Sequence, residues 1–242
     1  MSKTSRIDFA LSRTVVLRQG TQMVSYAVRP ITQEEWFAYF DGLISTAERK
    51  GREVIQHTDA SAAGVELVEK LAEYAGACEN GAFFSESEPV PSIPLAHKLA
   101  LANVLTSAFV PDEAMHRFGE IPLTAIWSAG ENGTMRRHKD LLHVFNEPTA
   151  EQNRRYRRDE SRAQIIGGSR KGVTVYKGAQ RTLAALYDEL IVRVEGYVFN
   201  GVPLEGQDSI AKHMDAYHKV ASVARLFVPQ EIEIEDEEEE GN

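Results

Sequence analysis

The fold of this chain is decided by two short stretches, Val28-Arg29-Pro30-Ile31-Thr32-Gln33-Glu34-Glu35-Trp36 and Phe145-Asn146-Glu147-Pro148-Thr149-Ala150-Glu151-Gln152. When Thr32 is placed on Thr149, an offset of 117 residues (149 − 32), Tyr39 also falls on Tyr156. In both stretches a Thr is followed three residues later by Glu or Gln, the pattern of a capping box at a helix start. The same kind of helix start is therefore predicted twice at one spacing.

The residues before each stretch predict a β-hairpin. Apolar and other residues alternate in 9–17 and 24–28, with a glycine turn between them. They alternate again in 123–127 and 141–145, where Asn132-Gly133 is a strong tight-turn signal. Alternation with a period of two places one face of each hairpin in a core.

The residues after each stretch predict helices. Apolar residues recur at helical spacing in 67–75 and again in 183–194. A third helix is predicted over about 94–109 in the first half and about 209–227 in the second. Each half is therefore expected to be a β-hairpin followed by about three helices.

These patterns predict an α+β fold made of two similar units. The first unit is expected over residues 1–112 and the second over 113–229. They form either two lobes in contact or one pseudo-twofold domain. Residues 230–242 are predicted to be a disordered acidic tail, because like charges repel and little apolar surface can be buried there.

The composition is that of a globular protein with a sizeable core. Of the 242 residues, 43% are hydrophobic and 26% are charged. No apolar run approaches the roughly 18 residues of a membrane span, and the polar first residues predict no signal peptide. Cys78 is the only cysteine, so an internal disulfide is excluded and a cytoplasmic location is expected.

The charge is unevenly distributed along the chain. The formal net charge is −9, but eight acidic residues lie in the last dozen positions and leave about −1 for the rest. Residues 135–171 hold ten Lys or Arg and five Asp or Glu. The chain therefore has a basic middle and an acidic tail.

The sequence nominates no catalytic, cofactor or metal residues. The seven histidines form no metal-ligand pattern, and an odd spacing is expected to place His138 and His143 on opposite faces of a strand. The glycine-rich segment 167–172 lacks the lysine of a phosphate-binding loop and is interpreted as a hairpin tip. Cys78 has no basic neighbour in sequence that would activate it. We therefore expect a protein that is not an enzyme and needs no cofactor.

The first capped helix is a candidate partner-binding surface. Its aromatic residues lie around much of its circumference: Trp36, Phe37, Tyr39 and Phe40. One side is expected to pack on the hairpin, and the remainder either binds a partner or is buried between the two units.

The second capped helix suggests an alternative, nucleic-acid-binding surface. Its arginines surround one aromatic residue, and two basic residues of the glycine-rich tip could add to it: Arg154, Arg155, Tyr156, Arg158, Arg162, Arg170 and Lys171. Arginines with an aromatic residue suit phosphates and bases. The acidic tail is then expected to compete with nucleic acid, whereas the plainer interpretation is a solvated helix face and a solubilising tail.

The unit of strand, turn, strand, Arg29-Pro30-Ile31-Thr32 and acidic-aromatic helix resembles the tail assembly chaperones of tailed phages. The resemblance covers about a third of the chain, and the second copy lacks the arginine and the tryptophan. It implies a non-enzymatic protein in the cytoplasm of the host cell that holds tail-tube or tape-measure subunits before assembly. The alternatives are a nucleic-acid-binding protein and a structural virion or connector component that forms a ring or higher oligomer.

Overall fold

The computed structural model describes residues 6–20, 22–50, 53–77, 93–106, 109–111, 119–128, 135–160, 164–166, 172–175 and 179–227. Helices and strands are both abundant, so the predicted α+β class is confirmed. No helix in these ranges is long and apolar enough to cross a membrane. The acidic tail, residues 230–242, lies outside the described residues.

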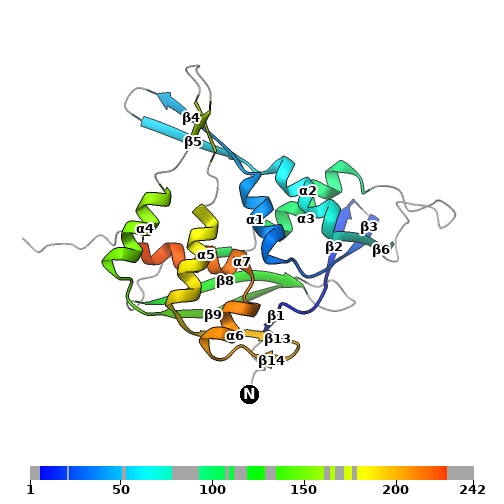
Figure 1. Cartoon of the computed structure of the whole chain (residues 1–242). Coiled ribbons are helices and arrows are strands. Elements are labelled where there is room, and N and C mark those ends of the chain that lie inside the picture. The colour runs from blue at the N-terminus through cyan, green and yellow to red at the C-terminus, as the bar shows by residue number, and fades with distance from the viewer. Residues whose placement is uncertain are drawn as a thin grey trace, which may run out of the picture.

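The first half packs three helices on a small antiparallel sheet (Figure 1). Strands β2 (Arg13–Gln19) and β3 (Gln22–Val28) form the predicted hairpin, and β6 (Ala72–Ala77) adds to β3. Helices α1 (Gln33–Asp41), α2 (Ser61–Leu71) and α3 (Leu95–Thr106) cover it. The core of this half contains alternate residues of β3, namely Val24, Tyr26 and Val28, as the period of two predicts.

The second half packs helices on a longer sheet with the order β12-β9-β8-β7. Its strands β8 (Glu120–Ser128), β9 (Met135–Phe145) and β12 (Ile191–Glu195) come from the second half, and its edge strand β7 (Phe109–Pro111) comes from the end of the first. The helices are α4 (Ala150–Glu160), α5 (Ala179–Leu190), α6 (Gln207–His213), α7 (Ala216–Val223) and the 3-10 turn Ala224–Phe227. A small sheet joins β1 (Ile7–Asp8) to β13 (Tyr197–Phe199) and β14 (Val202–Pro203).

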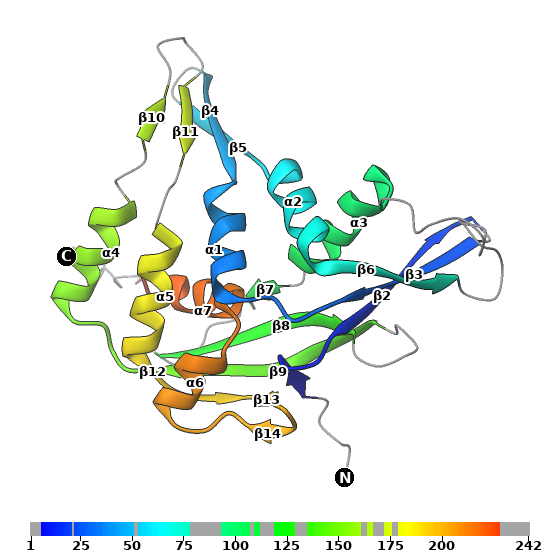
Figure 2. The same cartoon turned by 45° about the vertical axis from the view of Figure 1, so that its right-hand side comes forward.

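A further sheet takes two strands from each half. Its order is β10-β11-β4-β5, with β4 (Ile44–Lys50), β5 (Glu53–Asp59), β10 (Gln164–Ile166) and β11 (Gly172–Val175). Figure 2 shows it standing off one end of the molecule, above α1 and beside the end of α4. The strands predicted on either side of the glycine-rich tip are β10 and β11, and the tip itself, with Arg170 and Lys171, lies outside the described residues.

The order of elements recurs along the chain: hairpin, capped helix, second hairpin, helix and a strand that joins the first hairpin. The N–H of Arg29 donates to the carbonyl of Leu71 at 3.2 Å, and the N–H of Asn146 donates to the carbonyl of Leu190 at 2.9 Å. Val28 pairs with Ala72 as Phe145 pairs with Ile191. These correspondences support the interpretation of the chain as an internal duplication, which stays an interpretation.

Both predicted capping boxes are present. The Thr32 Oγ accepts from the N–H of Glu35 at 3.3 Å, and the Thr32 N–H donates to the Glu35 carboxylate at 2.9 Å. The corresponding distances between Thr149 and Gln152 are 3.2 and 2.9 Å. Helices α1 and α4 therefore begin at the capping boxes that the sequence predicted.

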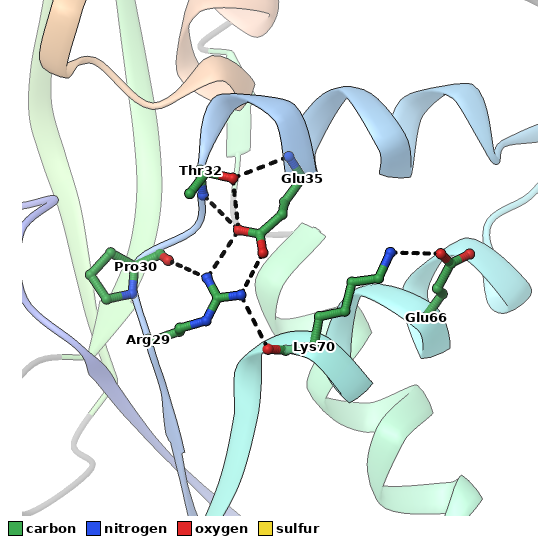
Figure 3. Close-up of polar contacts among 6 residues, drawn as sticks. All are labelled: Arg29, Pro30, Thr32, Glu35, Glu66 and Lys70. Carbon is green, nitrogen blue, oxygen red and sulfur yellow. Dashed lines mark hydrogen bonds and ion pairs between the residues drawn. The ribbon is translucent and has the colours of Figure 1, made fainter.

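Arg29 ties the first capping box to the next helix (Figure 3). Its Nη1 donates to the Glu35 carboxylate at 3.0 Å, and its Nη2 donates to the carbonyl of Lys70 at 3.2 Å. The hydrogen bond from Arg29 holds the pKa of Glu35 at about 2, with help from Thr32. The Arg-Pro-Ile-Thr segment that carries the phage resemblance thus fastens α1 to the end of α2.

Two helices end earlier than predicted. The helix expected over 67–75 ends at Leu71, and the one expected over 183–194 ends at Leu190. The following residues are extended because they pair with β3 and β9. Apolar residues at helical spacing cannot reveal such pairing, since the partner strand is far away in sequence.

The prediction that His138 and His143 lie on opposite faces of a strand is wrong. Both side chains are buried on β9. The register changes from Leu123 opposite Leu141 to Ala125 opposite His138, so β9 carries one extra residue. Such a bulge shifts the alternation of side chains by one position.

Packing also crosses the boundary predicted after residue 112. Strand β1 pairs with β13, β7 pairs with β8, and β4 pairs with β11. Each of these pairs joins a segment before residue 112 to one after it. The two halves are therefore closely interlocked, whatever their origin.

Candidate functional site: a sheet shared by the two halves

The aromatic residues of α1 do not form an exposed surface. Trp36, Phe37, Tyr39 and Phe40 are all at most 7% exposed. The hypothesis that they bind a partner is therefore corrected: in the folded chain these side chains are covered. The alternative that the helix is buried between the halves fits the contacts that it makes.

Contacts across the junction explain this burial. The Trp36 Nε1 donates to Asp215 Oδ2 at 2.7 Å, and the Trp36 ring lies 4.9 Å from the ring of Tyr217. At the next residue of α1, the Arg181 guanidinium lies over Phe37, 4.4 Å from the ring centroid, and donates to the Glu34 carboxylate. Asp215, Tyr217 and Arg181 belong to the second half, so α1 is a wedge between the two halves.

Helix α1 leads directly into the hairpin of β4 and β5, which lies next to the hairpin of β10 and β11 from the second half. Strand β4 begins at Ile44, two residues beyond Gly42 at the end of α1. Strands β10 and β11 lie between α4 and α5 in the chain. In the resulting junction Gly172 pairs with Ala47, Val173 with Thr46 and Thr174 with Ser45 in antiparallel register.

The junction joins unlike strands of the two hairpins. Strand β4 is the first strand of its hairpin, whereas β11 is the second strand of the other. A twofold arrangement would have joined two first strands or two second strands. The halves are therefore joined head to tail at this sheet.

The head-to-tail junction uses the second strand of one hairpin and the first strand of the other, so the two remaining strands, β10 and β5, form the outer edges of the sheet. Among the described residues, the outer strands β10 and β5 pair on one side only. Strand β10 is again a first strand and β5 again a second strand. An outer strand presents a row of unpaired N–H and C=O groups, which is a template for another strand. We take these two edges as the candidate functional site.

The arginine-rich helix α4 is partly engaged within the protein. Arg155 pairs with Glu189 at 2.7 Å, and Arg158 contacts Asp159. Tyr156 stacks on Phe227 with the ring centroids 4.6 Å apart, and is therefore part of the packing of the second half. Arg154 is exposed, and Arg162 lies outside the described residues. Nucleic-acid binding by this surface stays a prediction.

A buried histidine–tyrosine network was not predicted from sequence. His143 is fully buried, and its Nδ1 and Nε2 each lie 2.9 Å from a hydroxyl, of Tyr187 and Tyr197 respectively. The Tyr197 hydroxyl also lies 2.9 Å from His218 Nδ1. Burial lowers the pKa of His143 to about 3, lowers that of His218 well below its usual value, and raises those of both tyrosines. The network is therefore uncharged near neutral pH.

The network predicts a loss of stability in acid. Because the unfolded histidine has a pKa of about 6.5 and folded His143 one of about 3, the unfolded chain takes up the proton first as the pH falls. The stabilisation that neutral His143 gives the folded state is fully present above pH 6.5 and is lost as the pH falls towards 3. We expect the difference in unfolding free energy between wild type and His143→Gln to fall by about 1.4 kcal/mol per pH unit.

Urea unfolding at several pH values between 7.5 and 4.5 measures this difference. The partly buried His213 supplies a control, since His213→Gln should change the pH dependence less. A difference between wild type and His143→Gln that stays constant over this range would contradict the assignment.

Comparisons with known proteins give no relative. No protein family, curated protein or solved structure was found that matches this chain. No group of His, Cys, Asp and Glu suited to a metal ion lies within the residues that the structure describes. The site must therefore be judged on its own geometry.

Proposed function

We propose that this chain is a non-enzymatic assembly protein that joins protein chains by strand pairing at the open edges of the shared sheet. The observation that supports the proposal is the head-to-tail junction of β11 with β4, which leaves β10 and β5 as outer strands. Main-chain pairing of this kind gives affinity without requiring a pocket or a cofactor.

The partner that fits these edges best is a second copy of the same chain. The strands alternate in direction through β10, β11, β4 and β5, because every neighbouring pair is antiparallel. A β10 from another copy placed antiparallel to β5 continues this alternation and reproduces the first-strand to second-strand contact. Copies joined in this way are related head to tail, so they form a closed ring or an open filament.

Self-association of this kind favours the structural virion or connector class among the functions expected from sequence. The tail assembly chaperone is the second candidate, because the same edges could hold an extended segment of a client. In the motif behind that resemblance, Arg29 binds Glu35 of the same chain. The motif therefore does not itself mark a client surface.

Sedimentation velocity of the purified full-length chain over a wide range of concentrations tests the proposal. We expect a discrete multimer, or a series of growing species, that dissociates on dilution. A chain that stays monomeric at every concentration but captures tail-tube or tape-measure protein would favour the chaperone. A monomer that binds only nucleic acid, and loses it steeply with salt, would overturn both proposals.

A further inference from the structure

A pocket lies between the two halves, away from the shared sheet. It has a volume of about 220 Å³ and is lined from three sides. One wall comes from β2 and β8, with Arg13 and Trp127; another is the start of α1, with Thr32 and Gln33; the third is the end of α6, with Lys212 and His213.

Arg13 is an unusual residue in this pocket. Its side chain is 95% buried (relative exposure 5%), and the guanidinium carbon lies 3.2 Å from the centroid of the Trp127 ring. Within the described residues its guanidinium makes no hydrogen bond, and the charged group that acts on it is Asp215, through space. Burial lowers the pKa of Arg13 to about 9. No nitrogen of Arg13 is among the fully buried, unpaired polar atoms of the described residues, so its donors are reached from the pocket, where water or a ligand can accept from them.

Asp215 also lines the pocket, but its carboxylate is already engaged by hydrogen bonds. Its carboxylate accepts from Trp36 Nε1 at 2.7 Å and from the Tyr217 N–H at 2.9 Å. It therefore offsets part of the charge of Arg13 without satisfying its donors. Lys212 adds a second cation at the rim, where its side chain is exposed.

The start of α1 forms another wall of the pocket. Its N–H groups are partly satisfied there, because Thr32 accepts from the Glu35 N–H, and Glu34 and Glu35 place two carboxylates in the first turn. Thr32 and Gln33 line the pocket at this end. The cations at this cavity are therefore Arg13 and Lys212, which come from two separate elements.

We propose that this pocket binds a small oxyanion, a carboxylate or a phosphate, against the free edge of the Arg13 guanidinium. One face of the guanidinium is covered by Trp127, so the ligand lies in its plane, where a carboxylate or phosphate accepts two parallel hydrogen bonds. Because the walls come from both halves, the bound anion stabilises the junction. The site is independent of the proposed strand pairing.

Isothermal titration calorimetry of the full-length chain tests this site, with sodium phosphate and sodium succinate as separate probes and ionic strength held constant with sodium chloride. We expect saturable binding of at least one probe, and the responding probe identifies the class. Arg13→Met should weaken it by roughly tenfold or more, since hydrogen bonds to charged groups are lost. Lys212→Gln should weaken it by about threefold, as expected for a partly exposed charge.

Arg18→Met is the matched control, because Arg18 is an exposed arginine on the same strand β2. It should leave the affinity unchanged. The proposal is overturned if neither probe gives saturable heat, if Arg13→Met binds as wild type does, or if Arg18→Met weakens binding equally. Should Arg13→Met fail to fold, unchanged affinity in Lys212→Gln overturns it instead.

Discussion

Replacing Trp36 with alanine is expected to lower the free energy of unfolding by about 3–5 kcal/mol, the range for large buried aromatic residues. Trp36 has no exposed surface and contacts residues from both halves. The substitution also removes the donor to Asp215, whose buried carboxylate then lacks one hydrogen bond. Such a loss is a large fraction of the stability of an ordinary domain.

Urea unfolding at neutral pH measures this effect, with two controls. Trp36→Phe keeps most of the packing but loses the hydrogen bond to Asp215, so it should be less destabilising than the alanine variant. Leu95→Ala removes an apolar side chain that is 62% exposed and should change the stability by no more than about 0.5 kcal/mol. A Trp36→Ala protein as stable as wild type would show that α1 is not wedged between the halves.

Proline at the outer edge of β5 is expected to abolish association of copies while the fold is kept. Adjacent residues of a strand direct their N–H groups to opposite sides, and proline has no N–H to donate. One of the two variants Ile55→Pro and Gln56→Pro should therefore disturb the pairing with β4, and the other should block only the open edge. The variant that blocks only the open edge should melt close to the wild-type temperature yet remain monomeric at all concentrations.

Circular dichroism and sedimentation velocity separate these outcomes. Thermal melting reports on the folded chain, and sedimentation reports on association. If both proline variants associate as the wild type does, β5 is not the contact, and the proposed assembly through this edge is wrong.

The sequence predicted the parts of the fold that depend on neighbours in the chain. The capping boxes at Thr32 and Thr149 and the two hairpins before them need only local chemistry, and all are present. The strands β6 and β12 were missed because their extended form depends on pairing with β3 and β9. The hairpin of β4 and β5 shows no clear alternation in Ile44-Ser45-Thr46-Ala47-Glu48, so it could not be predicted either.

The candidate sites could not be predicted for a related reason. The shared sheet brings Thr46 beside Val173, and the junction brings Trp36 to Asp215, across distances in sequence that no local pattern reports. The sequence shows that α1 carries many aromatic residues, which suggested a binding surface. It does not show the residues of the second half that cover them. Arg13 gave no signal in sequence, since its burial depends on Trp127 of the other half.

Cysteine cross-linking between two different single variants tests the head-to-tail assembly most directly. In a Cys78→Ser background, Gln56→Cys lies on β5 and Gln164→Cys lies on β10, and a short bismaleimide tolerates a small error in register. The strand pairing proposed here predicts a cross-linked dimer when the two variants are mixed, and none with either variant alone. Cross-linking within one variant alone would reveal a twofold contact of like strands, and no cross-link in the mixture would contradict pairing of β5 with β10.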